Sequence, residues 1–239
     1  MKYLLSLIVG ILVGVALFAV GVIYNPLNSQ QLLSPLVVTD SQTVTLSYSG
    51  VAADAIVFTN NGESRIEPHP IKVQQLWEAS IRKTSAQVMV LLDGRNQAAG
   101  IGIKIASASE ETRLLAGIMQ IDSVWYVYLP SRGSLFIEQS ENYWYYVRDI
   151  VLPAYRSSAK TWSGFWLGNM TSGPGSLGTA IVTGGSGEFA DMEMLAVESL
   201  MVRTWRVDDG PLAAEGRLII ELPAEDDEEL PEEFAVEIE

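Results

Sequence analysis

The chain has 239 residues and a formal net charge of -14, and residues 221–239 alone contain ten acidic side chains and no basic one. The rest of the chain is mildly acidic and carries no basic stripe, which excludes nucleic acid as a partner. The sequence has no cysteine, which excludes disulfides, thiol catalysis, Cys-ligated metal sites and a lipoprotein anchor. Its single histidine, His69, lies between two prolines. We therefore expect no metal site and no cofactor.

The N-terminal segment is apolar enough to cross a membrane. Residues 4–23 carry no charge, and Ser6 is their only polar side chain. A helix of this length, at about 1.5 Å per residue, spans the roughly 30 Å hydrocarbon core of a bilayer. We predict a retained transmembrane anchor over residues 1–24. A cleaved signal peptide is the alternative, because Ala19 and Gly21 offer small residues for a cleavage site.

The charges that flank this helix predict its orientation. Lys2 precedes it, and no basic residue follows until Arg65. Positive residues stay on the cytoplasmic side, so we expect a single-pass protein of the cell inner membrane with its body in the periplasm or an equivalent extracytoplasmic space. Gly10 and Gly14 are spaced as in helix pairs that pack closely. A homodimer or another membrane-protein partner is therefore possible through these glycines.

The body is predicted to be a single folded domain, residues 36–222. A polar tether over residues 25–35 precedes it, and an acidic tail over residues 223–239 follows. Self-repulsion and scarce apolar area predict that the tail is disordered. A binding arm for a basic partner or for divalent cations is the alternative interpretation of the tail.

Short apolar segments with period-two alternation predict β-strands along the body. The expected strands are residues 43–48, 55–59, 87–92, 98–107, 112–121, 123–129, 134–138, 161–167, 178–184, 195–207 and 214–222. Helices are expected over residues 70–83 and over residues 139–152, the latter ending before Pro153. Many strands with few helices predict a mainly β fold, either a single antiparallel β-barrel or a sandwich, with one or two short helices.

One stretch carries a family resemblance. Residues 178–189 read Gly-Thr-Ala-Ile-Val-Thr-Gly-Gly-Ser-Gly-Glu-Phe, and residues 215–222 supply a closing strand. This pattern resembles the C-terminal part of allene oxide cyclase and dirigent-like β-barrels. We expect the glycines at 184–187 to form the tight turn between two strands. The resemblance implies a barrel with an apolar central cavity, and no catalytic residue of the family can be matched to a position here.

Aromatic residues are concentrated in the middle of the chain. They can form the core, a protein interface or the apolar wall of a ligand pocket. As candidate ligand-binding residues for a hydrophobic small molecule we take Trp125, Tyr126, Tyr128, Tyr143, Trp144, Tyr146, Trp162 and Trp166.

Four carboxylates could supply an acid–base pair, although surface charges are the more ordinary interpretation: Glu188, Asp191, Glu193 and Glu198. We favour a non-enzymatic binding or accessory module. One alternative is a cyclase or isomerase that holds an apolar substrate in the barrel and uses a carboxylate and tyrosine hydroxyls. Another is an accessory subunit of a larger membrane complex. A buried carboxylate facing tyrosines inside the barrel would favour the enzyme, and a completely filled barrel would count against it.

Overall fold

The computed structural model describes residues 2–23, 42–51, 58–60, 63–64 and 84–223. The expected tether, the helix over residues 70–83 and the acidic tail beyond residue 223 lie outside the described residues, as does most of the expected strand over residues 55–59. The predicted domain boundaries at these places therefore remain predictions.

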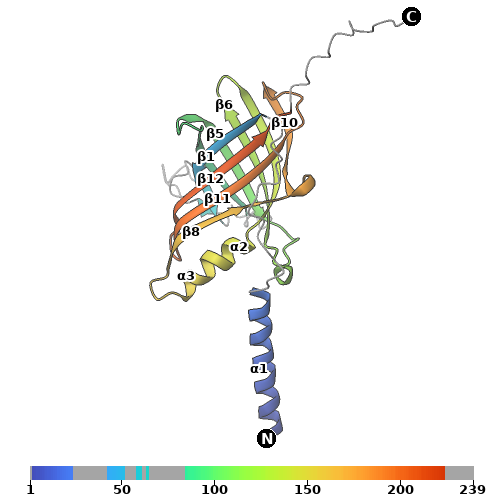
Figure 1. The fold of residues 1–239 in the computed structure, drawn as a ribbon, viewed down its shortest axis with the longest axis vertical. Coiled ribbons are helices and arrows are strands. Elements are labelled where there is room, and N and C mark those ends of the chain that lie inside the picture. Colours follow the sequence, from blue (N-terminus) through green and yellow to red (C-terminus); the bar gives the residue numbers. More distant parts are fainter. Residues whose placement is uncertain (1, 24–41, 52–57, 61–62, 65–83, 224–239) are drawn as a thin grey trace, which may run out of the picture.

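The N-terminal segment is a single helix, α1 (Lys2–Ile23). Residues 3–23 are long and apolar enough to cross a membrane by length and composition, and none of the window is buried inside the protein. A signal sequence has the same properties, so retention of the helix as an anchor is a proposal taken up below. In Figure 1 the helix extends away from one end of the sheet.

The described part of the body contains one sheet of twelve antiparallel strands. Their bounds are β1 (Thr43–Ser49), β2 (Phe58–Asn60), β3 (Glu63–Ser64), β4 (Thr84–Leu92), β5 (Ala98–Ala108), β6 (Gln120–Leu129), β7 (Gly133–Asn142), β8 (Thr161–Asn169), β9 (Thr171–Gly173), β10 (Ala180–Gly187), β11 (Leu195–Arg206) and β12 (Gly210–Glu221). A helical segment follows β7 and is made of α2 (Trp144–Tyr146), a π-helical stretch (Val147–Val151) and α3 (Leu152–Arg156). Single 3-10 turns lie at Leu114–Ala116 and Ser176–Gly178.

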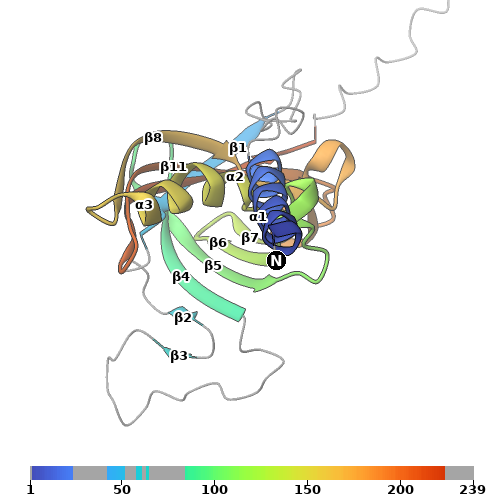
Figure 2. The ribbon, with the colours of Figure 1, turned by 90° about the horizontal axis from the view of Figure 1, so that it is seen from below.

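The strand order closes on itself. The sheet runs β1-β12-β11-β10-β7-β6-β5-β4, and a pairing between Ser47 of β1 and Leu92 of β4 joins its two ends. Two further strands extend the barrel wall: β8 pairs with β11, and β9 pairs with β7. Figure 2 shows the strands curving around a ring, with α2 and α3 lying across its lower end and α1 pointing toward the viewer. The predicted antiparallel β-barrel with short helices and an apolar N-terminal helix is thus confirmed.

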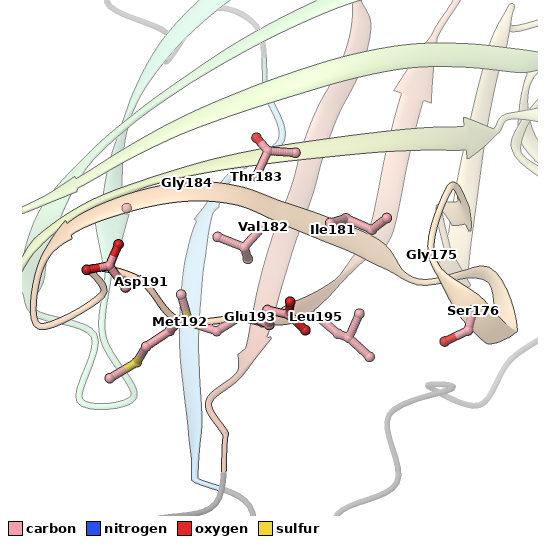
Figure 3. Close-up of a pocket in the computed structure, with 12 residues that line it drawn as sticks. Gly175, Ser176, Ile181, Val182, Thr183, Gly184, Asp191, Met192, Glu193 and Leu195 are labelled. Carbon is pink, nitrogen blue, oxygen red and sulfur yellow. The ribbon is translucent and has the colours of Figure 1, made fainter.

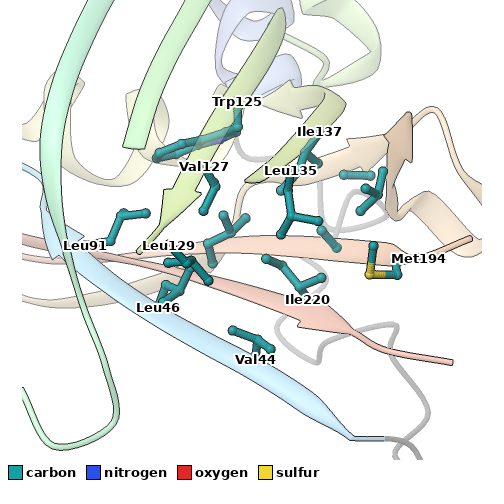
Figure 4. Close-up of a cluster of buried hydrophobic side chains, with 14 of the residues drawn as sticks. Val44, Leu46, Leu91, Trp125, Val127, Leu129, Leu135, Ile137, Met194 and Ile220 are labelled. Carbon is teal, nitrogen blue, oxygen red and sulfur yellow. The ribbon is translucent and has the colours of Figure 1, made fainter. Parts of the chain in front are cut away.

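Side chains alternate between the two faces of the strands, as a barrel requires. In β6, for example, Val127 and Leu129 are buried while Val124 and Tyr128 are exposed. The inward residues of one half of the barrel form a first core cluster, which includes Leu46, Leu91, Trp125, Val127, Leu129, Leu135, Ile137 and Ile220. Figure 4 shows these side chains meeting between the strands. This half of the barrel is filled by apolar packing.

A second apolar cluster lies at the helix-bearing end. It is made of Trp144, Tyr145, Ile150, Ala154, Trp166, Met170, Val202 and Trp205, with Val22 of α1 and Met119 packed against it. Tyr146 meets Trp166 edge-on with ring centroids 5.7 Å apart. This cluster attaches the helical segment to β8 and β11 and leaves the space between the two clusters to polar side chains.

Several sequence-based boundaries are wrong. Residues 112–119 of the expected strand over residues 112–121 form a loop with a 3-10 turn, and only the last two residues belong to β6. Arg113 pairs back to Ile118 in a tight reversal closed by Gly117. The expected helix over residues 139–152 begins later and passes through Pro153. The π-helical stretch ends at Val151, so Pro153 is the second residue of α3. Proline is tolerated in the first turn of a helix.

The glycine run does not form the turn that we expected. Gly184 to Gly187 belong to β10 and pair with β7 as far as Gly133, and the chain reverses after residue 187. Gly187 has φ +67°, and a Cβ there would lie 2.3 Å from the carbonyl oxygen of Arg132. The glycines therefore serve a close approach of two strands in addition to a reversal of the chain.

Candidate functional site

Buried polar side chains meet in the middle of the barrel, between the two apolar clusters. They come from strands that are distant in sequence, and each occupies an inward position of its strand. The members of this buried polar cluster are Tyr48, Lys104, Ser123, Gln139, Glu141, Thr171 and Glu198. Because an unpaired charge inside a protein is costly, their arrangement must satisfy every charge locally.

Glu198 of β11 is the hub of the cluster. Lys104 Nζ donates to both of its carboxylate oxygens, at 2.8 Å to Oε1 and 2.7 Å to Oε2. The Tyr48 hydroxyl donates to Oε1, and the Gln139 side-chain amide donates to Oε2. The Trp125 indole N–H also reaches Oε2, at 3.3 Å. This carboxylate is held by four side chains from four different strands.

Glu141 of β7 forms the second half of the ion pair. Its Oε2 accepts from Lys104 Nζ at 2.9 Å, and its Oε1 accepts from the Ser123 hydroxyl at 2.6 Å. Tyr143 is hydrogen-bonded to the same carboxyl group. One ammonium group is thus shared between two fully buried carboxyl groups.

The two carboxyl groups differ in acidity. For Glu198, burial by itself raises the pKa, but the Lys104 ammonium and the hydrogen bonds from Lys104, Tyr48 and Gln139 hold that pKa below its usual value. For Glu141, burial raises the pKa more than Lys104 lowers it, and the charge of Glu198 raises it further. The surroundings therefore favour the ionised form at Glu198 and the protonated form at Glu141, each relative to a carboxyl group in water.

Lys104 and Tyr48 remain protonated in this setting. Burial lowers the pKa of Lys104, but Glu141 and Glu198 outweigh that effect and raise it. Burial and the nearby Glu198 raise the pKa of Tyr48 well above its usual value. Among the described residues, no group of three or more His, Asp or Glu side chains could hold a metal ion. The side chains of this cluster can donate and accept hydrogen bonds and can exchange protons.

A cavity of about 270 Å³ lies against this cluster. Tyr48, Lys104 and Glu198 form its polar floor. The remaining wall is mostly apolar or aromatic and consists of Gly50, Ser85, Gln87, Ala106, Ile121, Tyr143, Tyr146, Met170, Leu200 and Pro211. The Trp125 ring of the first core cluster packs edge-on against Tyr48, with ring centroids 5.2 Å apart, so the cavity floor adjoins that cluster. Apolar walls around a few fixed polar groups are typical of small-molecule sites.

A larger hollow, about 860 Å³, lies elsewhere, where β10 separates from β11 (Figure 3). It is lined by residues 181–185 of β10 and by the segment 191–195, and includes the carboxylates of Asp191 and Glu193. Both carboxylates are exposed, and no member of the buried polar cluster reaches this hollow. We therefore place the candidate site in the smaller interior cavity.

The predicted aromatic residues divide between three places. Tyr143 and Tyr146 line the cavity, and Trp125 contacts Glu198. Trp144 and Trp166 are buried in the second apolar cluster.

The other three lie away from the cavity. Trp162 packs against the second apolar cluster, and Tyr126 stacks on Phe136 on the outer face of the sheet, with ring centroids 4.9 Å apart. Tyr128 is 46% exposed on the same outer face. The structure thus brings three of the eight candidates to the site.

The expectation that the four carboxylates are surface charges is wrong for Glu198, which is 2% exposed. It holds for Glu188, Asp191 and Glu193, which are exposed. Glu188 makes only a surface ion pair with Arg132. Glu198 shares the inward positions of β11 with Ala196, Leu200 and Val202, so strand parity was the available signal.

The known proteins that resemble this chain are solved structures with low similarity scores. No family model and no curated protein sequence matches the chain. Two pterocarpan synthase dirigent proteins of known structure are similar to it. The first has 12% identity and a TM-score of 0.42 over 77% of this chain and 96% of its own, and the second has 12% identity and a TM-score of 0.34 over 78% and 87%. Because both TM-scores are below 0.5, the assignment of a barrel rests on the strand pairing of this chain itself.

Proposed function

We propose that this chain is a membrane-anchored extracytoplasmic β-barrel that binds a small hydrophobic molecule in its interior cavity. The observation that carries the proposal is the fixed polar floor of Tyr48, Lys104 and Glu198 beneath apolar walls. An ion pair with only a structural role needs no adjoining cavity and could be surrounded by tightly packed side chains, as the residues of the first core cluster are. Here it faces open space, where its polar groups can orient a ligand.

The remaining parts of the proposal concern location and partners. Helix α1 is retained as the anchor in the inner membrane, with its N-terminus cytoplasmic and the barrel in the periplasm or its equivalent. Its length, its lack of burial and the position of Lys2 support this. Gly10 and Gly14 have open space around them, which leaves room for a second helix against that face.

Blocking the cavity tests the binding proposal. Ala106 lines the cavity, whereas Ala98 is exposed at the other end of the same strand. Native mass spectrometry of the full chain, extracted from its membrane in mild detergent, should show a bound molecule in the wild type and in Ala98→Phe. The complex should be lost in Ala106→Phe. Equal occupancy in all three, or no bound mass in any, would contradict binding in this cavity.

A second candidate function is proton transfer, as in a cyclase or isomerase. It is favoured by one specific observation, a buried carboxylate facing a tyrosine hydroxyl at the cavity floor, Glu198 with Tyr48. The ionised Glu198 would take a proton from a carbon of the bound molecule and return it at another carbon. The Tyr48 hydroxyl would turn from Glu198 to donate its one hydrogen bond to an oxygen on that molecule.

Hydrogen exchange tests this second candidate even while the substrate is unidentified. The co-purified molecule, incubated with the protein in D₂O, should gain a carbon-bound deuterium detectable by mass spectrometry. Glu198→Gln should abolish the gain. Retention of the molecule without deuterium in the wild type would leave binding as the function and reject catalysis of this kind.

A further inference from the structure

We propose that the helix-bearing end of the barrel lies on the membrane surface, and that the cavity takes up its ligand from the bilayer. The ligand class that fits is a lipid with a small, uncharged, hydrogen-bonding head and an apolar chain. This inference rests on the proposed ligand binding in the cavity and adds the source and class of the ligand.

The first observation is where the apolar helix meets the barrel. Val22, in the last turn of α1, packs against the second apolar cluster. Figures 1 and 2 show α1 leaving the barrel from the end that carries α2 and α3. If α1 crosses the bilayer, its final residues lie at the outer interface, which brings this end of the barrel to the same level.

The second observation is exposed apolar side chains at that same end. Leu114 and Leu115, in the loop between β5 and β6, are 50% and 69% exposed. Tyr155 of α3 is 52% exposed. Met119, which precedes β6 in the same loop as the two leucines, packs on the second apolar cluster, as does Val22 of α1. Leucine and tyrosine side chains in such a position suit the boundary between headgroups and acyl chains.

The third observation is that the residues lining the cavity come from the half of the barrel nearer this end. Its outer wall includes Ile121 at the start of β6, Tyr143 and Tyr146 at the start of the helical segment, and Pro211 at the start of β12. In an antiparallel barrel these positions share one end. The first core cluster fills the opposite half. Because the opposite half is filled, this arrangement favours entry of a ligand from the membrane side.

The charge and the size of the site define the ligand head. The ammonium of Lys104 is already matched by Glu198 and Glu141, so an anionic head would add an unpaired buried charge. An uncharged hydroxyl, carbonyl or phenol can instead exchange hydrogen bonds with Tyr48 and Glu198. The cavity of about 270 Å³ has the volume of roughly nine water molecules in the liquid. It accommodates a single ring or a short polar head, while a longer chain remains in the bilayer.

Spin labels test membrane docking directly, because the chain has no native cysteine. Leu115→Cys places a label on the proposed docking surface, and Arg95→Cys places one in the exposed turn between β4 and β5 at the opposite end. In phosphatidylcholine nanodiscs that hold the full chain, the label at position 115 should be relaxed more by oxygen than by a water-soluble nickel chelate. The label at position 95 should show the reverse. Equal accessibility of both labels to the nickel chelate would overturn the docking surface while leaving cavity binding intact.

Photo-cross-linking tests the ligand class. Two probes share one diazirine-bearing alkyl chain, and one ends in a phenol and the other in a carboxylate. In the same nanodiscs the phenol probe should label residues that line the cavity, and the carboxylate probe should label them at least about tenfold less, because of its unpaired charge. Ala106→Phe should remove the labelling and Ala98→Phe should retain it. Equal labelling by both probes would overturn the uncharged head. No cavity labelling by the phenol probe, with the label at position 115 immersed, would overturn uptake from the bilayer.

Discussion

Replacing Lys104 by methionine tests the buried polar cluster most severely. Methionine keeps much of the side-chain volume but removes the ammonium that lies 2.9 Å from Glu141 and 2.7 Å from Glu198. Removal of one partner from a buried ion pair costs about 3–5 kcal/mol. A domain stable by roughly 5–15 kcal/mol would survive this loss with a much smaller margin. We expect the free energy of unfolding at pH 8 to fall by that amount.

The loss should depend on pH. Without the ammonium, Glu141 and Glu198 bind protons more tightly in the folded barrel than in the unfolded chain. A carboxyl group with a raised folded pKa contributes stability that is present at low pH and lost as the pH rises through that pKa. The deficit of Lys104→Met should therefore shrink between pH 8 and pH 5, by up to about 1.4 kcal/mol per pH unit for each proton taken up.

Urea unfolding of the full chain in detergent, followed by tryptophan fluorescence, measures both effects. The exposed Lys160, whose ammonium donates only to a backbone carbonyl, provides the matched control, and Lys160→Met should change the stability by less than about 0.5 kcal/mol. Adding Glu198→Gln to Lys104→Met should recover part of the loss. A loss below about 1 kcal/mol, or one that does not vary with pH, would refute the argument that the Lys104 ammonium stabilises the buried carboxyl groups of Glu141 and Glu198.

Three further predictions follow from other features. Lys104 and Tyr48 have raised pKa values in the folded barrel, so protonation of these groups stabilises the folded state. This stabilisation should be complete below about pH 10 and should be lost as the pH rises further. An unfolding midpoint that stays constant up to about pH 12 would contradict this. Gly187→Val should destabilise the barrel by roughly 1–3 kcal/mol, because position 187 has a positive φ and a Cβ there would clash with the backbone of Arg132. Gly184→Ala should be tolerated, because the nearest atom to its Cβ would be a ring carbon of Phe136 at 3.9 Å. Chemical denaturation of both variants measures the difference. The full chain should resist carbonate extraction from membranes, and removal of the N-terminal helix should release it; extraction of the full chain would show that the helix is no anchor.

The fold class could be predicted because its signals are local. Period-two alternation and turn residues mark strands one at a time, and β4 and β5 with their Asp93-Gly94 turn lie close to the expected positions. Boundaries failed where tertiary contacts override local preference. The helix expected over residues 139–152 loses its first four residues to β7, because residues 139–142 pair with β6.

The choice of inward face could not be read from apolar alternation alone. Ile101 and Ile105 alternate in β5 as core residues do, yet they are 44% and 49% exposed on the outer face. The inner face of this strand carries Gly102 and Lys104 instead. Gly102 is needed because a Cβ there would approach the Trp125 ring to 3.0 Å, and Lys104 is needed to balance the carboxyl groups on other strands.

The candidate site was missed for the same reason. Lys104, Glu141 and Glu198 lie on β5, β7 and β11, which are not consecutive in sequence, and each taken alone resembles an ordinary surface charge. Only the register of the sheet brings them to one level of the barrel. The aromatic candidates were a better indicator, because Tyr143 and Tyr146, at the start of the helical segment, line the cavity.

The most direct test of the central claim is a crystal structure of the full chain purified from its own membrane in mild detergent. The account predicts electron density for a bound molecule in the cavity between Tyr48, Lys104 and Leu200, with a polar atom within hydrogen-bond distance of Glu198 or Tyr48. A cavity occupied only by water, or closed by side chains that pack directly on Lys104, would contradict ligand binding at this site.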